Sequence, residues 1–185
     1  CLRVPDGEAY AKNAGVGSGV GLPKGTVNRT SGLLDKNAWA DVVRNEIQKD
    51  PMVDIELKPE LVNDASGKPE KLKISTALAI STDKFSCNLQ LWILESDIIA
   101  LQYGLNNVYD FNYKHDHVFR ASVNGFNGEA VSIVYDTPTT IEHEIDLDPK
   151  WNAENLSVVG FVYNGSGVLQ AVEAKVSSGS DEPEE

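Results

Sequence analysis

Hydrophobic residues recur at every second position through much of the chain after residue 51. Val53, Ile55 and Leu57 alternate with charged residues, which is the period of a β-strand with one buried face. Further segments of strand length lie near residues 71–81, 89–94, 98–101, 117–123, 129–135, 139–147, 156–163 and 168–176. Strands at this spacing, without helices between them, predict a mainly β chain in which residues 51–176 form an antiparallel two-sheet β-sandwich.

Two pairs of these segments predict hairpins. The residues Asn164–Gly167 (NGSG) are a turn sequence and join the last two strands. Ser96 and Asp97 also indicate a turn, so we expect Leu89–Leu94 to pair with Ile98–Leu101. The run Leu89–Leu94 is nearly continuously apolar, which is typical of a central strand covered on both faces.

The first 50 residues differ from the rest in glycine content and in the spacing of their apolar residues, and they predict a small α/β segment with one helix. Residues 15–25 hold five glycines and a proline, so the backbone must turn there. Asp35 is a suitable N-cap, apolar residues follow at helical spacing as far as Lys49, and Pro51 ends the helix. At the other end of the chain, residues 177–185 are polar and acidic and predict a disordered tail.

The formal net charge of −12 excludes two classes of partner, because nucleic acids and anionic lipids would be repelled. No apolar run reaches the ~18 residues that a membrane-spanning helix needs, so we expect no transmembrane span. The two cysteines, Cys1 and Cys87, indicate little about the redox compartment. A cysteine at position 1 is what a mature bacterial lipoprotein shows after cleavage, which makes Cys1 a candidate for a lipid anchor.

His115 and His117 are the sharpest chemical feature of the sequence. Two histidines at i and i+2 of a strand point to the same side and can share a metal ion. Further ligands would be needed, such as Asp110, Glu142 or His143, and the spacing does not show that these converge. We therefore expect a structural role for both histidines and no metal. The sequence contains no GxSxG, HExxH or CxxC motif, so we also expect no catalytic centre and no cofactor.

The segment 103–113 (YGLNNVYDFNY) is the candidate ligand-binding region. It places aromatic rings next to amide and carboxylate groups, a combination that often holds sugars or peptides. We expect a long loop over residues 103–116, with Tyr109, Asp110, Asn112 and Tyr113 addressing one ligand together. The alternative is that the rings cover one end of the sandwich.

Several motifs together resemble the twenty-eight-kilodalton outer-membrane protein family of Bacteroides-group bacteria. In order along the chain these motifs are Pro23–Arg29 (PKGTVNR), 89–96 (LQLWILES) with 97–102 (DIIALQ), Tyr113–Arg120 (YKHDHVFR), Trp151, 156–164 (LSVVGFVYN) and 168–176 (VLQAVEAKV). The resemblance implies an exported protein of the cell outer membrane and cell surface, held by a lipid anchor rather than by a transmembrane span. Members of this family have no assigned biochemical role, and for this chain we expect a binding or scaffold role, with a glycan or a protein as ligand.

The same family carries a thioredoxin-like module ahead of its β domain, and residues 22–49 resemble the end of that module. By this resemblance the Leu22–Pro23 peptide bond should be cis. Two other functions stay open: an accessory fragment of a thioredoxin-like thiol-redox protein, and a carbohydrate-binding module. The paired-cysteine part of the module is missing from this sequence, so no redox activity is carried over from the family.

Overall fold

A computed structural model describes residues 2–81, 84–104 and 108–178. The N-terminal part contains α1 (Pro5–Asn13), β1 (Lys24–Gly25), β2 (Leu34–Asp35) and α2 (Lys36–Glu46). The strands that follow are β3 (Val53–Asn63), β4 (Pro69–Ile80), β5 (Lys84–Glu95), β6 (Ile98–Tyr103), β7 (Tyr109–His115), β8 (Val118–Ser122), β9 (Glu129–Val134), β10 (Thr139–Asp146), β11 (Leu156–Asn164) and β12 (Gly167–Lys175), with a 3-10 turn at Ala153–Asn155 before β11.

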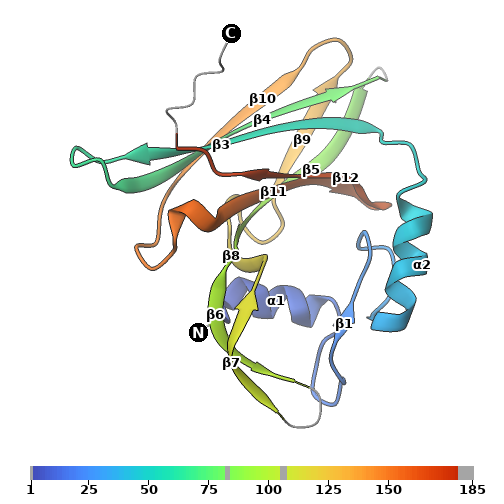
Figure 1. The fold of residues 1–185 in the computed structure, drawn as a ribbon. Helices are drawn as coiled ribbons and strands as arrows, with labels where there is room; N and C mark the ends of the chain where they lie inside the picture. Colours follow the sequence, from blue (N-terminus) through green and yellow to red (C-terminus); the bar gives the residue numbers. More distant parts are fainter. Residues whose placement is uncertain (1, 82–83, 105–107, 179–185) are drawn as a thin grey trace.

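Two antiparallel sheets pack face to face and confirm the predicted β-sandwich (Figure 1). One sheet has the strand order β10-β4-β3. The other has the order β12-β11-β5, and the far edge of β5 pairs with β9 along its first half and with β8 along its second half. The predicted hairpin at Asn164–Gly167 is confirmed, because β11 pairs with β12 there.

The core lies between the two sheets and follows the alternation of the sequence. Leu72, Ile74 and Leu78 point inward from β4 and are fully buried. They contact inward-facing residues of the second sheet, of which the largest are Leu89, Leu91, Ile93, Ile133, Leu156, Val158 and Val162. Burial of apolar surface of this kind is the main force that holds the two sheets together.

The outer face of the second sheet is covered by the N-terminal segment. The ring of Tyr10 on α1 lies 4.9 Å from Trp92 and 4.4 Å from Phe126, measured between ring centroids. Its hydroxyl lies 2.7 Å from Ser122 Oγ and donates to the Phe126 carbonyl at 2.8 Å. The guanidinium of Arg29 lies over three rings of the same sheet, those of Trp92, Phe161 and Tyr163. Strand β5 is therefore covered on both faces, as predicted.

Two predictions about the elements were wrong. The N-terminal segment contains two helices rather than one, because Pro5–Asn13 forms α1. The segment Ile98–Leu101 does not fold back on Leu89–Leu94 but pairs with β7 in a separate two-stranded sheet. The Leu22–Pro23 peptide bond is cis, as expected.

Candidate functional site

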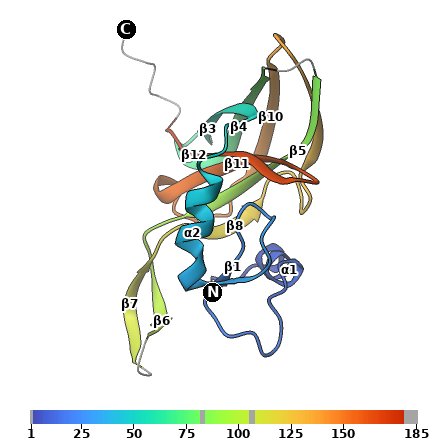
Figure 2. The same cartoon turned by 90° about the vertical axis from the view of Figure 1, so that its right-hand side faces the viewer.

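Strands β6 and β7 form a hairpin that extends away from the sandwich (Figure 2). The hairpin continues the pairing of β5 with β8, since Glu95 pairs with Val118 and Ile98 then pairs with His115. The predicted loop over residues 103–116 is therefore wrong in part, because Tyr109–His115 is strand β7. Asn106 and Asn107 of that segment lie outside the described residues.

A kink joins the hairpin to the sandwich. Asp97 and His117 both have positive φ, at 61° and 54°, which is uncommon for residues other than glycine. Side chains of the opposite strand accept hydrogen bonds from their backbone amides: Asp97 N–H donates to Asp116 Oδ1, and His117 N–H donates to Ser96 Oγ. These reciprocal bonds connect the two strands at the point where both change direction.

A β-bulge divides the hairpin into two unlike faces. Ala100 pairs with Tyr113 and Gln102 pairs with Asp110, so Phe111 and Asn112 together oppose the single residue Leu101. Residues that pair across a ladder share a face, and side chains alternate along each strand. One face therefore carries five apolar side chains, which we call the apolar face: Ile99, Leu101, Tyr103, Tyr109 and Phe111.

The apolar face is solvent-exposed. The exposed fractions of its five residues run from 50% for Leu101 to 72% for Phe111. On the opposite face Ile98, Ala100, Gln102 and His115 are half-buried, with Tyr113 and Asp110 more exposed. Large apolar residues exposed side by side in this way mark an interaction surface more often than isolated ones do.

The four predicted ligand-binding residues all lie on β7 but do not form one surface. Tyr109 belongs to the apolar face, whereas Tyr113 lies on the other face with its ring 4.7 Å from that of His115. The carboxylate of Asp110 accepts a hydrogen bond from the backbone amide of Asn112. The bulge causes this separation, and strict alternation of the sequence does not predict it.

His115 and His117 do not share one strand face, in contrast to the expected geometry. His115 ends β7, while His117 lies in the kink with its Nε2 atom 3.3 Å from Glu173 Oε1. His143 is half-buried on β10, where its Nε2 atom is 2.8 Å from Glu129 Oε1. Within the described ranges, no three residues of the types His, Cys, Asp and Glu gather at metal-binding distance.

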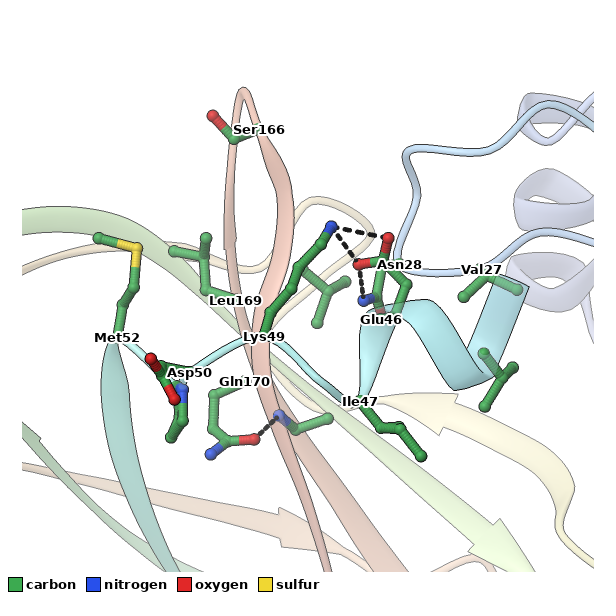
Figure 3. A pocket seen from close by; sticks show the side chains of 14 residues that line it. Val27, Asn28, Glu46, Ile47, Lys49, Asp50, Met52, Ser166, Leu169 and Gln170 are labelled. Carbon is green, nitrogen blue, oxygen red and sulfur yellow. Dashed lines mark hydrogen bonds and ion pairs between the residues drawn. The ribbon is translucent and has the colours of Figure 1, made fainter. Parts of the chain in front are cut away.

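A second feature, which the sequence reasoning missed, is a groove of about 670 Å³ between α2 and β12 (Figure 3). One wall of the groove is apolar and exposed, with Val43, Ile47 and Met52 at 43%, 75% and 50%. The only signal for it in the sequence is the apolar pair Val43 and Ile47, which belongs to the helical spacing that predicted the helix after Asp35. We call this feature the α2–β12 groove.

Polar groups fix one end of the α2–β12 groove. The carboxylate of Glu46 accepts hydrogen bonds from Lys49 Nζ at 2.7 Å and from Asn28 Nδ2 at 2.8 Å (Figure 3). The hydrogen bond from Lys49 lowers the pKa of Glu46 most, and the hydrogen bond from Asn28 is the next largest cause. The carboxylate therefore stays charged and ties the end of α2 to Asn28 in the loop between β1 and β2.

The other wall of the groove is the first half of β12, which is an edge strand of its sheet. Its backbone amide at Val168 donates to the Asn28 carbonyl at 2.8 Å. The amide of Ala171 donates to Oε1 of the neighbouring Gln170 side chain at 3.0 Å. A side chain of the same strand thus occupies the outward donor at which a further strand would pair.

Cys87 is buried in the core on β5, and burial raises the pKa of its thiol. A thiol in such surroundings is a poor nucleophile, because the thiolate is the reactive form. Cys1, the candidate for lipid attachment, lies outside the described residues. Within the described part of the chain, neither helix has the length and apolar character needed to cross a bilayer.

Known proteins relate to this chain at the level of family and fold. The sequence matches the family described as Outer membrane protein Omp28 over residues 8–180. The structure is similar to HBP35 of Porphyromonas gingivalis, with a TM-score of 0.69 and 15% identity over 96% of this chain and 60% of that one. It also matches a domain of the outer membrane lipoprotein Omp28 from Porphyromonas gingivalis, with a TM-score of 0.47 and 21% identity over 71% of this chain and 93% of that one.

No curated protein matches the chain in sequence. The similarity to HBP35 concerns the fold, and this chain spans about three fifths of the length of that protein. The family match, in contrast, covers most of α1, all of α2 and both sheets of the sandwich. The predicted resemblance is confirmed: this chain belongs to the Omp28 family and is a protein of the cell outer membrane.

Proposed function

We propose that this outer membrane protein is a non-catalytic binding or scaffold protein of the cell surface. In this proposal the α2–β12 groove receives an extended segment of a protein ligand. The observation that carries it is the edge of β12, where the outward amide of Ala171 is occupied only by the side chain of Gln170. When that side chain rotates away, the amide becomes available to the backbone of a ligand strand.

The chemistry of the groove suits such a ligand. A peptide that adds to a sheet edge gains affinity from main-chain hydrogen bonds and specificity from side-chain pockets. The side chains of Val43, Ile47 and Met52 line the groove together with the first half of β12 and offer apolar contact to side chains of the added strand. The ligand that this arrangement favours is therefore an extended peptide with apolar side chains on one face.

Selection from a phage-displayed library of random linear peptides tests the proposal, with calorimetry on the selected peptide. Ala171→Pro removes the outward amide without touching the ladder to β11, and we expect an affinity loss of about tenfold or more. Gln170→Ala removes the competing side chain and should strengthen binding. Ile47→Glu should abolish it, because a charge then enters the apolar wall.

Val134→Glu is the matched control, since Val134 is 47% exposed on β9, outside the groove. If all three groove variants bind the selected peptide as the unchanged protein does, the groove is not the binding site. The four residues first expected to bind, Tyr109, Asp110, Asn112 and Tyr113, would then be tested in the same way.

We further propose that a lipid on Cys1 holds the protein at the membrane. Metabolic labelling with an alkyne fatty acid, in cells that express the natural precursor, should label the protein and leave Cys1→Ser unlabelled. Labelling that persists in Cys1→Ser would contradict attachment at this residue.

A further inference from the structure

The apolar face of the β6–β7 hairpin gathers five of the large hydrophobic side chains that are exposed on the described surface. It presents two tyrosines, one phenylalanine, one leucine and one isoleucine, all at least 50% exposed. Strands β6 and β7 contain a single carboxylate, Asp110, and it lies on the opposite face. In a chain with 28 acidic residues, this face carries no negative charge and only Lys114, opposite Ile99, as a cation.

The cation of this face is already neutralised. Lys114 forms an ion pair with Asp97, and the pKa of Lys114 is raised by Asp97 as hydrogen-bond and charge partner. The surface therefore offers apolar and aromatic contact without net charge. Tyrosine is enriched at the boundary between lipid headgroups and acyl chains, and phenylalanine and leucine are typical of the inserted face of elements that lie in this layer.

The hairpin also projects from the body of the protein, as Figure 2 shows, and its described residues line neither the α2–β12 groove nor the pockets beside Trp151 and Leu2. Sites for small ligands and sugars are concave and enclose much of the ligand. A projecting apolar ribbon instead suits a soft, extended partner into which it can insert.

The first residues that the structure describes lie near the base of this hairpin. Leu2 and Val4 line one pocket together with Phe119, and Phe119 is the second residue of β8, directly after the kink. A lipid on Cys1, the proposed anchor, would be joined to the chain directly before Leu2, and therefore next to the residues from which the hairpin begins.

We infer that the apolar face of the β6–β7 hairpin inserts into the interfacial layer of the lipid bilayer and orients the protein on the membrane. Contact with lipid through a fold element is a second attachment besides an acyl chain, and stable anchoring commonly takes two such signals. Because the whole chain carries a net charge of −12, the contact depends on apolar insertion and not on attraction to anionic headgroups.

Flotation of the purified, non-acylated chain with phosphatidylcholine vesicles tests the inference. We expect the chain to float with the vesicles, and the bound fraction to stay the same between low and high salt. Addition of anionic phosphatidylglycerol should lower the bound fraction. The double change Tyr109→Asp with Phe111→Asp should reduce partition by about tenfold or more, because it places two charges in the inserted face.

Tyr135→Asp is the matched control for one of these changes, because Tyr135 and Tyr109 are both 55% exposed and Tyr135 lies in the turn after β9. Both variants should keep the melting temperature of the unchanged chain, so a loss of partition reports contact and not unfolding. Phe111→Trp should give blue-shifted fluorescence on vesicles.

Four outcomes would overturn the inference. The first is equal partition of the hairpin and control variants, and the second is binding that requires anionic lipid and low salt. The third is hairpin-dependent binding of soluble oligosaccharides without vesicle binding, which would favour a glycan site. The fourth is a dimer that dissociates on Phe111→Asp in sedimentation, with no vesicle binding, which would favour a second copy as the partner. Loss of peptide binding in the groove variants leaves this test unaffected.

Discussion

Strands β5 and β6 are consecutive in the chain and are both rich in aliphatic residues, yet their surroundings differ completely. Leu91 and Ile93 of β5 are fully buried between two sheets, whereas Ile99 and Leu101 of β6 are 60% and 50% exposed. The kink at Asp97 and His117 separates the two regions. The comparison indicates that apolar residues of the sandwich serve folding, while those of the hairpin are available for contact with a partner.

The largest expected difference is between two isoleucines on either side of the kink. Ile93→Ala should lower the free energy of unfolding by about 2–5 kcal/mol, because it leaves a cavity in a core that cannot fully close. Ile99→Ala should change it by less than about 0.5 kcal/mol, as for other exposed sites. Urea unfolding followed by circular dichroism measures both. A comparable loss in Ile99→Ala would mean that the hairpin is part of the folding core.

The buried ion pair at the end of β5 is the next largest contribution. Glu95 Oε2 accepts a hydrogen bond from Arg120 Nε at 2.7 Å, and Glu95 Oε1 accepts one from the backbone amide of Asn152. The side chains of Glu95 and Arg120 are only 6% and 13% exposed. Arg120→Met should destabilise the protein by about 3 kcal/mol, because it leaves a buried carboxylate without its counter-charge.

The exposed pair Lys71 with Glu144 is the control for this prediction. The two side chains are 38% and 51% exposed, so Lys71→Met should cost less than about 1 kcal/mol. If Glu95→Gln combined with Arg120→Met recovers part of the lost stability, the uncompensated charge is the cause. Equal losses in the two single variants would contradict the difference in burial.

A smaller effect is expected at the contact between α1 and the sheet. Tyr10→Phe keeps the ring but removes the hydroxyl, which lies near Ser122 Oγ, donates to the Phe126 carbonyl and accepts from Trp92 Nε1. We expect a loss of about 1 kcal/mol in thermal or urea unfolding. Tyr109→Phe on the hairpin should have no measurable effect, and an equal loss there would weaken the distinction between the two regions.

The smallest effect concerns thiol chemistry. Because Cys87 is buried and the pKa of its thiol is raised, a disulfide reagent such as DTNB should react with it only when the sandwich opens. We expect the chain to give no turnover in an insulin-reduction assay, and we expect the Cys87→Ser variant to give the same result in that assay. Turnover that disappears in Cys87→Ser would instead favour the thiol-redox alternative.

The sequence predicts the sandwich well because its signals are local. Alternation in Val53–Leu57 and the turn at Asn164–Gly167 each depend on neighbouring residues and were confirmed. Helix α1 was missed because none of its residues is buried, so it has no apolar stripe. The signal in the sequence that identifies α1 is Pro5 in its first turn, together with the acidic residues Asp6 and Glu8.

The candidate site was less predictable because its geometry depends on distant residues. Ser96 and Asp97 were interpreted as a reversal of the chain, but their amide and hydroxyl groups bond across the ribbon to Asp116 and His117. The aromatic residues of β7 alternate and indicate a strand in retrospect. The bulge opposite Leu101, which turns Tyr113 away from Tyr109, arises only from the pairing with β6.

The cover that α1 and Arg29 place over the second sheet has a consequence for how the protein can be divided. Residue 50 is where helical spacing gives way to alternation, and it looks like a natural point at which to begin a shorter protein for expression. A chain that began there would lack Tyr10 and Arg29, and the rings of Trp92, Phe119 and Phe161 would lose their cover. Such a product should aggregate, so the N-terminal segment and the sandwich have to be produced together in one chain.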